Sequence, residues 1–243
     1  MMILAIDSGK TFLKLGIYNQ NEVLKRFQVT YNHIDDILLK VTTEFDIDNI
    51  VLSIVGHFDK SYLEKYFPKT KTIFINHNCL FPFENTYETP QTLGIDRMVL
   101  SAGAVLSYPN KNRMIIDMGS CITYDFINDK NQYLGGAISP GVDMRLKTLN
   151  EKTASLPLIE AKTFDEVIGK STKTAILSGV MTAILFEMEG FINYFRKEND
   201  NFIIILTGGS SIFFVKPLKS LIFAEPNFLM DSLVKLFIYQ TKQ

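Results

Sequence analysis

The chain has 243 residues, of which 47% are hydrophobic and 21% are charged, and its formal net charge is −1. This composition can bury a large core in one or two domains, and it lacks the basic excess that nucleic acids or anionic membranes attract. Asp7 interrupts the apolar start and no segment approaches about 20 uninterrupted apolar residues, so we expect neither a signal sequence nor a membrane span. Cys79 and Cys121 form no metal-binding pattern, which favours a cytoplasmic protein.

The first half of the chain alternates strands and helices. An apolar strand ends at Asp7 and is followed by Gly9 and an alternating strand that runs to Asn19. Strands and helices then alternate, which predicts an α/β sheet. The predicted elements are a helix over 34–45, a strand over 50–55, a short helix over 62–67 and a strand over 72–75.

A loop over 79–90 leads to a helix that begins at Gly94, and Pro109 and Asn110 end that helix. We therefore expect two domains, residues 1–113 and 114–243, with the last helix packing back on the first domain. The second half is predicted to hold strands over 114–127, a glycine-rich segment over 135–141 that bends around a ligand, a helix over 146–156, a long helix after Thr172, strands over 202–206 and near 220–223, and a helix over 228–239.

Two strand–turn–strand segments resemble each other. Aligning Asp7 with Asp117 also aligns Gly9 with Gly119, and each acid ends an apolar strand. Glycine allows the main chain to approach a ligand closely, and a carboxylate there can face a metal-bound phosphate. The pattern predicts an internal repeat, with two related halves that each bring one acid to a shared cleft. A single Asp-x-Gly is often only a β-turn, but two copies in the same setting favour the repeat.

Other catalytic patterns are absent from the sequence. The segments that begin at Gly9 and Gly169 resemble the end of a P-loop, but the required earlier glycine is replaced by Leu4 and Phe164. The three histidines are scattered, and no serine or cysteine pattern for acyl transfer is present. The two acidic turns and the Thr207-Gly208-Gly209 turn therefore remain the candidate nucleotide site.

These motifs resemble the acetate and sugar kinase, Hsp70 and actin superfamily, and within it the type III pantothenate kinases. The resemblance implies an α/β fold of two related ribonuclease H-like (actin-like) domains, with mixed sheets flanked by helices and an active site in the cleft between them. The motifs occur in the family's order over nearly the whole chain. They are Asp7-Ser8-Gly9-Lys10-Thr11, Tyr87 with Pro90 and Gly94-Ile95-Asp96-Arg97, Asp117-Met118-Gly119-Ser120, Gly135 to Gly141, Thr153 to Pro157, Gly169 to Thr172 with Ser178-Gly179, and Thr207-Gly208-Gly209.

The resemblance implies ATP-dependent phosphorylation of pantothenate to 4′-phosphopantothenate, the first step of coenzyme A biosynthesis. Asp96 is then the catalytic base, Asp117 binds a monovalent cation (K⁺ or NH₄⁺), and Asp7 handles Mg²⁺ through the ATP phosphates. Thr172 reaches the substrate from the other subunit of a homodimer. The implied ATP-binding residues are Asp7, Ser8, Gly9, Lys10, Thr11, Phe12, Leu13, Lys14 and Ser120, and the implied pantothenate-binding residues are Tyr87, Gly94, Ile95, Asp96, Arg97 and Thr172.

The sequence departs from the family at three positions of these turns. Lys10 stands where the family has Asn and adds a cation beside the phosphates, Ser120 replaces Thr but keeps the hydroxyl, and Cys121 replaces Ala. Two alternatives stay open. One is an accessory or regulatory binding protein of the same family, and the other is a kinase of the superfamily that acts on a sugar-like alcohol. The intact acids favour the enzyme.

Overall fold

The computed structural model describes residues 1–9, 11–54, 58–164, 166–199, 201–218 and 222–242. Lys10, His57 and the start of the strand expected near 220 lie outside the described residues. The chain forms two compact units. The first comprises Met1–Tyr108 and Phe228–Gln243, and the second comprises Pro109–Asn227.

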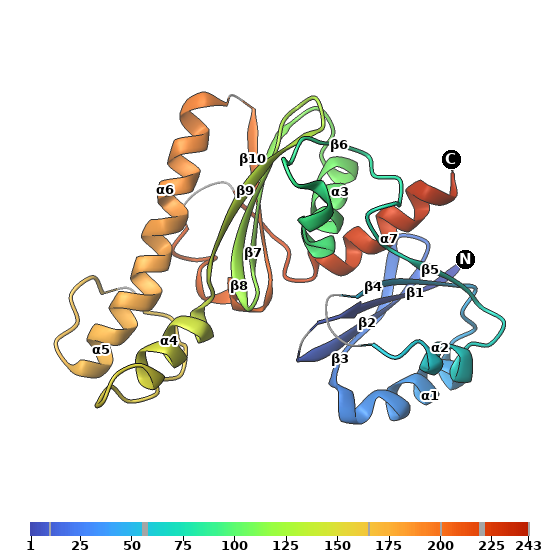
Figure 1. Cartoon of the computed structure of the whole chain (residues 1–243), viewed down its shortest axis with the longest axis horizontal. Coiled ribbons are helices and arrows are strands. Elements are labelled where there is room, and N and C mark those ends of the chain that lie inside the picture. Colours follow the sequence, from blue (N-terminus) through green and yellow to red (C-terminus); the bar gives the residue numbers. More distant parts are fainter. Residues whose placement is uncertain (10, 55–57, 165, 200, 219–221, 243) are drawn as a thin grey trace. The chain divides into compact units, whose positions relative to one another are not determined.

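The first unit is a mixed sheet between two layers of helices (Figure 1). Its strands lie in the order β3-β2-β1-β4-β5, with β1 antiparallel to β2 and parallel to β4. Its elements are β1 (Met2–Ser8), β2 (Phe12–Asn19), β3 (Glu22–Thr30), α1 (Ile34–Glu44), β4 (Asn49–Ile54), α2 (Ser61–Tyr66), β5 (Lys71–Phe74), the two-residue β6 (Glu84–Asn85), α3 (Ile95–Ser107) and α7 (Phe228–Thr241).

The core of the first unit lies on both faces of this sheet. Alternate residues of β1 point to opposite faces, so Leu4 and Ile6 pack with α1 and α2 while Ile3 and Ala5 pack with α3 and α7. Because Asp7 continues the series of Ile3 and Ala5, its side chain points to the face that α3 covers.

The second unit repeats the plan of the first sheet. Five strands of its sheet lie in the order β11-β10-β7-β8-β9, with β7 antiparallel to β8 and parallel to β10. The internal repeat predicted from the two acidic turns is therefore present as a repeated strand topology. The elements are β7 (Asn112–Met118), β8 (Cys121–Ile127), β9 (Gln132–Pro140), α4 (Val142–Glu151), α5 (Thr172–Leu177), α6 (Ala183–Glu198), β10 (Phe202–Thr207) and β11 (Ile222–Ala224).

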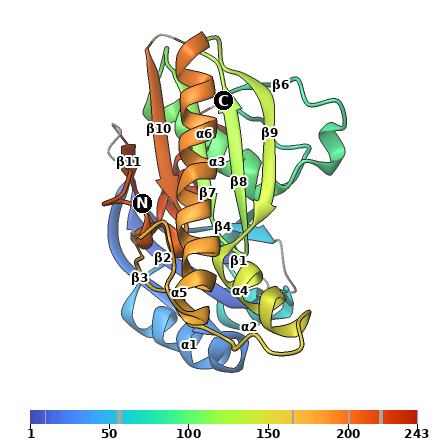
Figure 2. The same cartoon turned by 90° about the vertical axis from the view of Figure 1, so that its left-hand side faces the viewer.

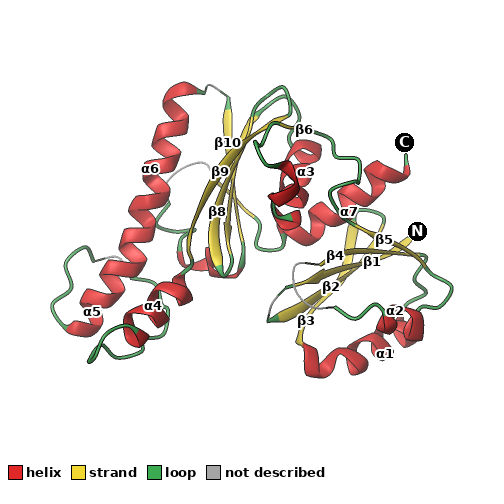
Figure 3. Ribbon diagram, viewed as in Figure 1, coloured by secondary structure: helices red, strands yellow, loops and turns green. Residues whose placement is uncertain are grey.

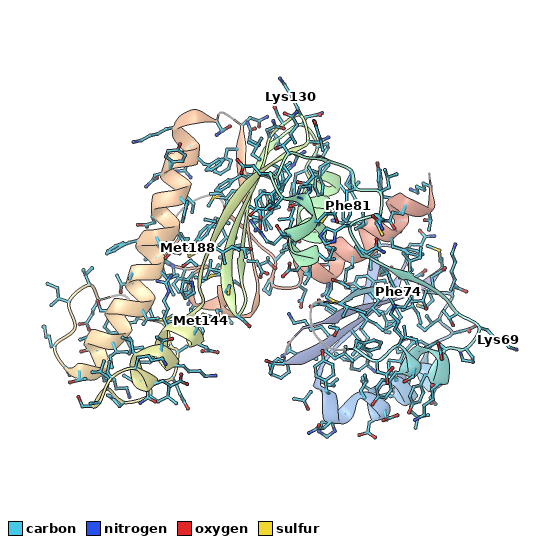
Figure 4. All side chains as sticks on the ribbon, viewed as in Figure 1. Lys69, Phe74, Phe81, Lys130, Met144 and Met188 are labelled. Carbon is cyan, nitrogen blue, oxygen red and sulfur yellow. The ribbon has the colours of Figure 1, made fainter. Side chains whose placement is uncertain are left out.

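The long helical segment of the second unit lies along its sheet, as Figure 2 shows for α6. It is interrupted by one π-helical turn, Ser178–Thr182, between α5 and α6. Its apolar face, which includes Val180, Ile184 and Met188, belongs to the hydrophobic core of this unit. Figure 4 shows Met188 on the side of α6 that faces the sheet.

Among the described residues, one helical segment, Thr172–Lys197, has the length and mean hydropathy (1.6) of a membrane span. These two properties are weak evidence, because core helices share them and 44% of the most apolar window is already buried inside the structure. The segment also carries Glu187, whose carboxylate is bonded within the unit.

One prediction for the second unit is wrong. The glycine-rich segment over 135–141 was expected to bend around a ligand, but Gln132–Pro140 forms the strand β9 and pairs with β8. Only Gly135 takes a positive φ, 116°, next to the register shift at Phe126 and Ile127. Ladder hydrogen bonds to β8 outweigh the low strand propensity of the glycines.

The separation of each unit into strands and covering helices can be followed in Figure 3.

Candidate active site

The first acidic turn places a buried carboxylate at the end of β1. Asp7 is 6% exposed, and its register partners are Lys14 on β2 and Ser53 on β4. Burial raises the pKa of the Asp7 carboxyl to about 6, the charge of Lys14 opposes this rise, and the charge of Asp96 adds to it. An added cation would therefore stabilise the ionised form of Asp7.

Hydrogen bonds close the turn after Asp7. The Tyr31 hydroxyl donates to the Gly9 carbonyl oxygen at 2.5 Å and lies 2.8 Å from Ser8 Oγ, while the Gly9 N–H donates to the Phe12 carbonyl oxygen at 3.1 Å. Of the predicted ATP-binding residues here, Ser8 and Leu13 are fully buried, whereas Thr11 and Phe12 are exposed. The side chain of Leu13 thus belongs to the core.

The N-terminus of α3 supplies a second acid close to Asp7. Asp96 Oδ1 accepts a hydrogen bond from the Arg97 backbone N–H at 2.8 Å. A Cβ on the capping residue Gly94 would lie 2.4 Å from that same oxygen, so a larger residue there would displace the Asp96 carboxylate. The contribution of Asp96 to the pKa of Asp7 places the two carboxylates within electrostatic range of each other.

Arg97 and Tyr87 complete this group. Arg97 is 6% exposed, and its guanidinium carbon lies 5.9 Å from the centroid of the Tyr87 ring. The Tyr87 backbone N–H donates to Asn85 Oδ1 at 3.0 Å, which holds the loop before α3. Ile95 packs against the core under α3. The structure therefore brings together four predicted residues of the first unit: Asp7, Tyr87, Asp96 and Arg97.

The second acidic turn meets two glycine turns. Asp117 is in register with Thr123 on β8 and Thr207 on β10. Gly208 has φ +88°, and a Cβ there would lie 2.5 Å from Asp117 Oδ1 and 2.6 Å from the Met118 backbone nitrogen. Only glycine fits this conformation and this approach.

On the other side of that turn lies Gly141. Its N–H donates to the Ser120 carbonyl oxygen at 3.1 Å, and a Cβ on it would lie 2.4 Å from that oxygen. Gly119 and Ser120 themselves are exposed. The second unit thus presents an acid, a hydroxyl and open main chain together, which suits the phosphates of a nucleotide.

Thr172 lies in a different part of the second unit. It is exposed and begins α5, where Ser171 and Thr174 form a capping box. A Cβ on Gly169 would lie 2.2 Å from the Ala175 nitrogen, so the preceding loop packs tightly on this helix start. The predicted role of Thr172 towards a partner subunit stays a prediction.

Sequence reasoning missed several residues around these turns. Tyr31 holds the Gly9 turn, and Ser53, opposite Asp7, is buried with no hydrogen-bond partner for Oγ among the described residues. Ser53 is the only polar residue in the segment I-V-L-S-I-V, and that interruption was a usable signal. The contacts of Tyr31 depend on β3 lying beside β2, so they leave no local pattern.

The residues present fit Mg²⁺ bound mainly through a nucleotide. Among the described residues, no group of three or more histidine, cysteine or acidic side chains could hold a metal ion. Mg²⁺ commonly binds one or two carboxylates together with substrate phosphates, and Asp7, with its raised pKa, provides such a carboxylate.

Solved structures with the same fold define the class of protein. A Baf family protein from Campylobacter jejuni matches with a TM-score of 0.64 at 22% identity, covering 99% of this chain and 100% of that one. A ROK family glucokinase from Streptomyces griseus, solved with glucose and AMPPNP, matches with a TM-score of 0.55 at 11% identity and covers 100% of both chains. At these identities the likeness establishes the fold alone, which is the actin-like fold with two mixed sheets flanked by helices.

The sequence comparisons are more specific. The family model for type III pantothenate kinase matches residues 3–194. The type III pantothenate kinase of Flavobacterium johnsoniae is 43% identical over 240 residues, 98% of both chains, and that of Bacteroides fragilis is 34% identical over 241 residues, again 98% of both. This chain belongs to the type III pantothenate kinase family.

Proposed function

We propose that this enzyme transfers the γ-phosphoryl group of ATP to the primary hydroxyl of pantothenate, giving 4′-phosphopantothenate in the first step of coenzyme A biosynthesis. Family membership over nearly the full length supports this reaction. The observation that carries it is the group formed by Asp7, Asp96, Arg97 and Tyr87 at the start of α3. It combines an acid for a nucleophilic hydroxyl with a cation for a carboxylate substrate.

Each side chain of this group has a chemical task in the proposal. The Asp96 carboxylate accepts the proton of the pantothenate hydroxyl. The hydroxyl oxygen bonds to the γ-phosphorus of ATP, and the bond between that phosphorus and the ADP oxygen breaks. The Arg97 guanidinium pairs with the pantothenate carboxylate, because its planar fork suits two oxygens. Tyr87, Gly94 and Ile95 shape the same pocket for pantothenate.

The nucleotide side of the proposal uses both acidic turns. Asp7 and residues Ser8 to Lys14 would bind the ATP phosphates, and Mg²⁺ held there would neutralise charge on those phosphates. Asp117 binds a monovalent cation, and Ser120 contacts ATP. We also propose two domains divided near residues 113 and 114, with the last helix, α7, packed back on the first domain.

The proposal includes a cytoplasmic homodimer. Phe186 and Tyr194 on α6 are 52% and 63% exposed, and large apolar side chains of that kind favour a covered surface. Thr172 then contributes to the site of the partner subunit. The free thiols of Cys79 and Cys121 agree with a reducing compartment. Sedimentation that finds a fully active monomer would contradict the dimer.

One assay tests the function. ADP release from ATP is measured with pantothenate, and in parallel with glucose and glycerol, in potassium, ammonium and sodium salts. We expect release with pantothenate alone, and faster release in potassium or ammonium than in sodium. Release with glucose or glycerol would indicate a sugar-like substrate, and binding of pantothenate without turnover would indicate a regulatory protein. Equal rates in the three salts would contradict the proposal that Asp117 binds a monovalent cation needed for activity.

A further inference from the structure

Arg145, on α4, is the centre of a polar network in the second unit. Its Nε donates to the Pro140 carbonyl oxygen at 2.8 Å, and its Nη2 donates to Ser139 Oγ at 2.5 Å and to Glu187 Oε2 at 2.6 Å. The Tyr124 hydroxyl donates to the other oxygen of Glu187 at 2.7 Å. The network thus joins α4, α6, β8 and β9 through one guanidinium and one carboxylate.

The network is only partly accessible to water. The side chains of Arg145 and Glu187 are 19% and 25% exposed, and Tyr124 is fully buried. Burial tends to raise the pKa of Glu187, but hydrogen bonds from Arg145, Tyr124 and Ser139 hold it below its usual value. Glu187 is therefore ionised at neutral pH, and charge-assisted hydrogen bonds of this kind are roughly twice as strong as neutral ones.

The two residues of β9 that Arg145 holds are the ones that support the Gly119–Ser120 turn. Pro140 pairs with Cys121 and Ser139 pairs with Ile122 in the β8–β9 register. The next residue, Gly141, donates its N–H to the Ser120 carbonyl oxygen. A shift of Pro140 would therefore move Gly141 and, through that hydrogen bond, the Ser120 backbone.

We propose that Arg145 is a positioning residue for nucleotide binding, which sets the Gly119–Ser120 turn through Pro140 and Gly141, with Glu187 and Tyr124 fixing the guanidinium. The inference rests on the proposed function, because it takes Ser120 as a contact of ATP. In this inference Arg145 contacts neither substrate, yet it controls the affinity for ATP and leaves the affinity for pantothenate nearly unchanged.

The first unit contains a matched control network. The Arg26 guanidinium and the Tyr18 hydroxyl both donate to Asp231 Oδ1, at 2.5 Å and 2.7 Å. The chemistry is the same combination of arginine, carboxylate and buried tyrosine. Tyr18 pairs with Ile3, whereas Asp7 pairs with Lys14 towards the other end of β1. Loss of Arg26 should therefore cost stability without moving an acidic turn.

The experiment compares Arg145→Met, Arg145→Lys and Arg26→Met with the unaltered enzyme. Steady-state kinetics give kcat and the KM for each substrate, thermal melting gives stability, and NMR gives the exchange rate of the Gly141 amide. We expect both Arg145 variants to raise the KM for ATP about tenfold, with kcat and the KM for pantothenate changed less than about threefold. Lysine keeps a charge for Glu187 but cannot also reach Pro140 and Ser139, so Arg145→Lys should melt near the unaltered enzyme and still bind ATP poorly.

Arg26→Met should melt at a lower temperature with an unchanged KM for ATP, and Gly141 should exchange faster only in the Arg145 variants. The inference is overturned if Arg145→Lys has a normal KM for ATP, or if Gly141 exchanges equally slowly in all proteins. If the unaltered enzyme does not phosphorylate pantothenate, the proposed function fails, and the Gly141 exchange rates still decide whether Arg145 positions the turn.

Discussion

The two sheets share a strand order, but the residues beside their acids differ. In the first unit Asp7 is buried between Lys14 and Ser53, while in the second Asp117 is partly exposed between Thr123 and Thr207. The neighbours come from the same two strands of the repeated plan in each case. The first acid therefore has one charged and one hydroxyl neighbour, and the second has two neutral hydroxyl neighbours.

A second difference concerns what faces each acid. Asp96 adds another carboxylate close to Asp7, whereas the main chain of Gly208 packs directly on Asp117. The first unit thus concentrates charge at the start of α3, and the second offers backbone to a ligand. One topology can therefore carry two different groupings of side chains, because the residues at matching positions decide the chemistry.

Among the substitutions that test this comparison, Asp96→Asn should have the largest effect, which is a loss of turnover. The amide keeps the shape of the side chain but cannot accept a proton, so we expect turnover to fall by about 10²–10⁴-fold while pantothenate still binds. The measurements are turnover and pantothenate affinity. Asp36→Asn, a first-turn acid of α1, serves as the control for a simple helix-end effect. A near-normal turnover with a lower melting temperature would show that Asp96 only stabilises the start of the helix and is not the base.

Gly208→Ala should cause the next largest change. Its positive φ and its contact with Asp117 leave no room for a Cβ, so we expect a loss of roughly 2–5 kcal/mol in the free energy of unfolding, from backbone strain and overpacking together. Gly209→Ala is the matched control, since nothing lies within 4 Å of a Cβ built there. Denaturant unfolding of both variants measures the difference, and equal stabilities would show that Asp117 does not depend on a close backbone.

Asp7→Asn should have the smallest effect, which is an increase in the free energy of unfolding. Folding raises the pKa of Asp7 from 3.8 to about 6, so ionisation costs stability progressively as the pH rises through this range and fully above it. We expect the variant to be more stable than the unaltered enzyme by about 1–3 kcal/mol at pH 8, and by little near pH 4. Unfolding at the two pH values measures this, and a stability difference independent of pH would exclude burial of the charge as the cause.

The parts of the fold that could be predicted from the sequence are those with local patterns. The strand ending at Asp7, its copy ending at Asp117 and the helix after Gly94 were all recognisable from apolar periodicity and glycine turns. The glycine-rich segment before Pro140 was misread, because its strand character comes from pairing with β8. The π-helical turn at Ser178–Thr182 left no recognised signal either.

Local sequence patterns were enough to predict the two acidic turns and their likeness to each other, and the order of the motifs along the chain was enough to predict the kinase family. The folded structure was needed to find that Tyr31 closes the Gly9 turn, that Gly208 packs on Asp117 and that Arg145 reaches Glu187. In each of these pairs the partners lie on elements distant in sequence. Their contacts, and the raised pKa of Asp7, follow from burial and sheet register, which no local pattern of residues contains.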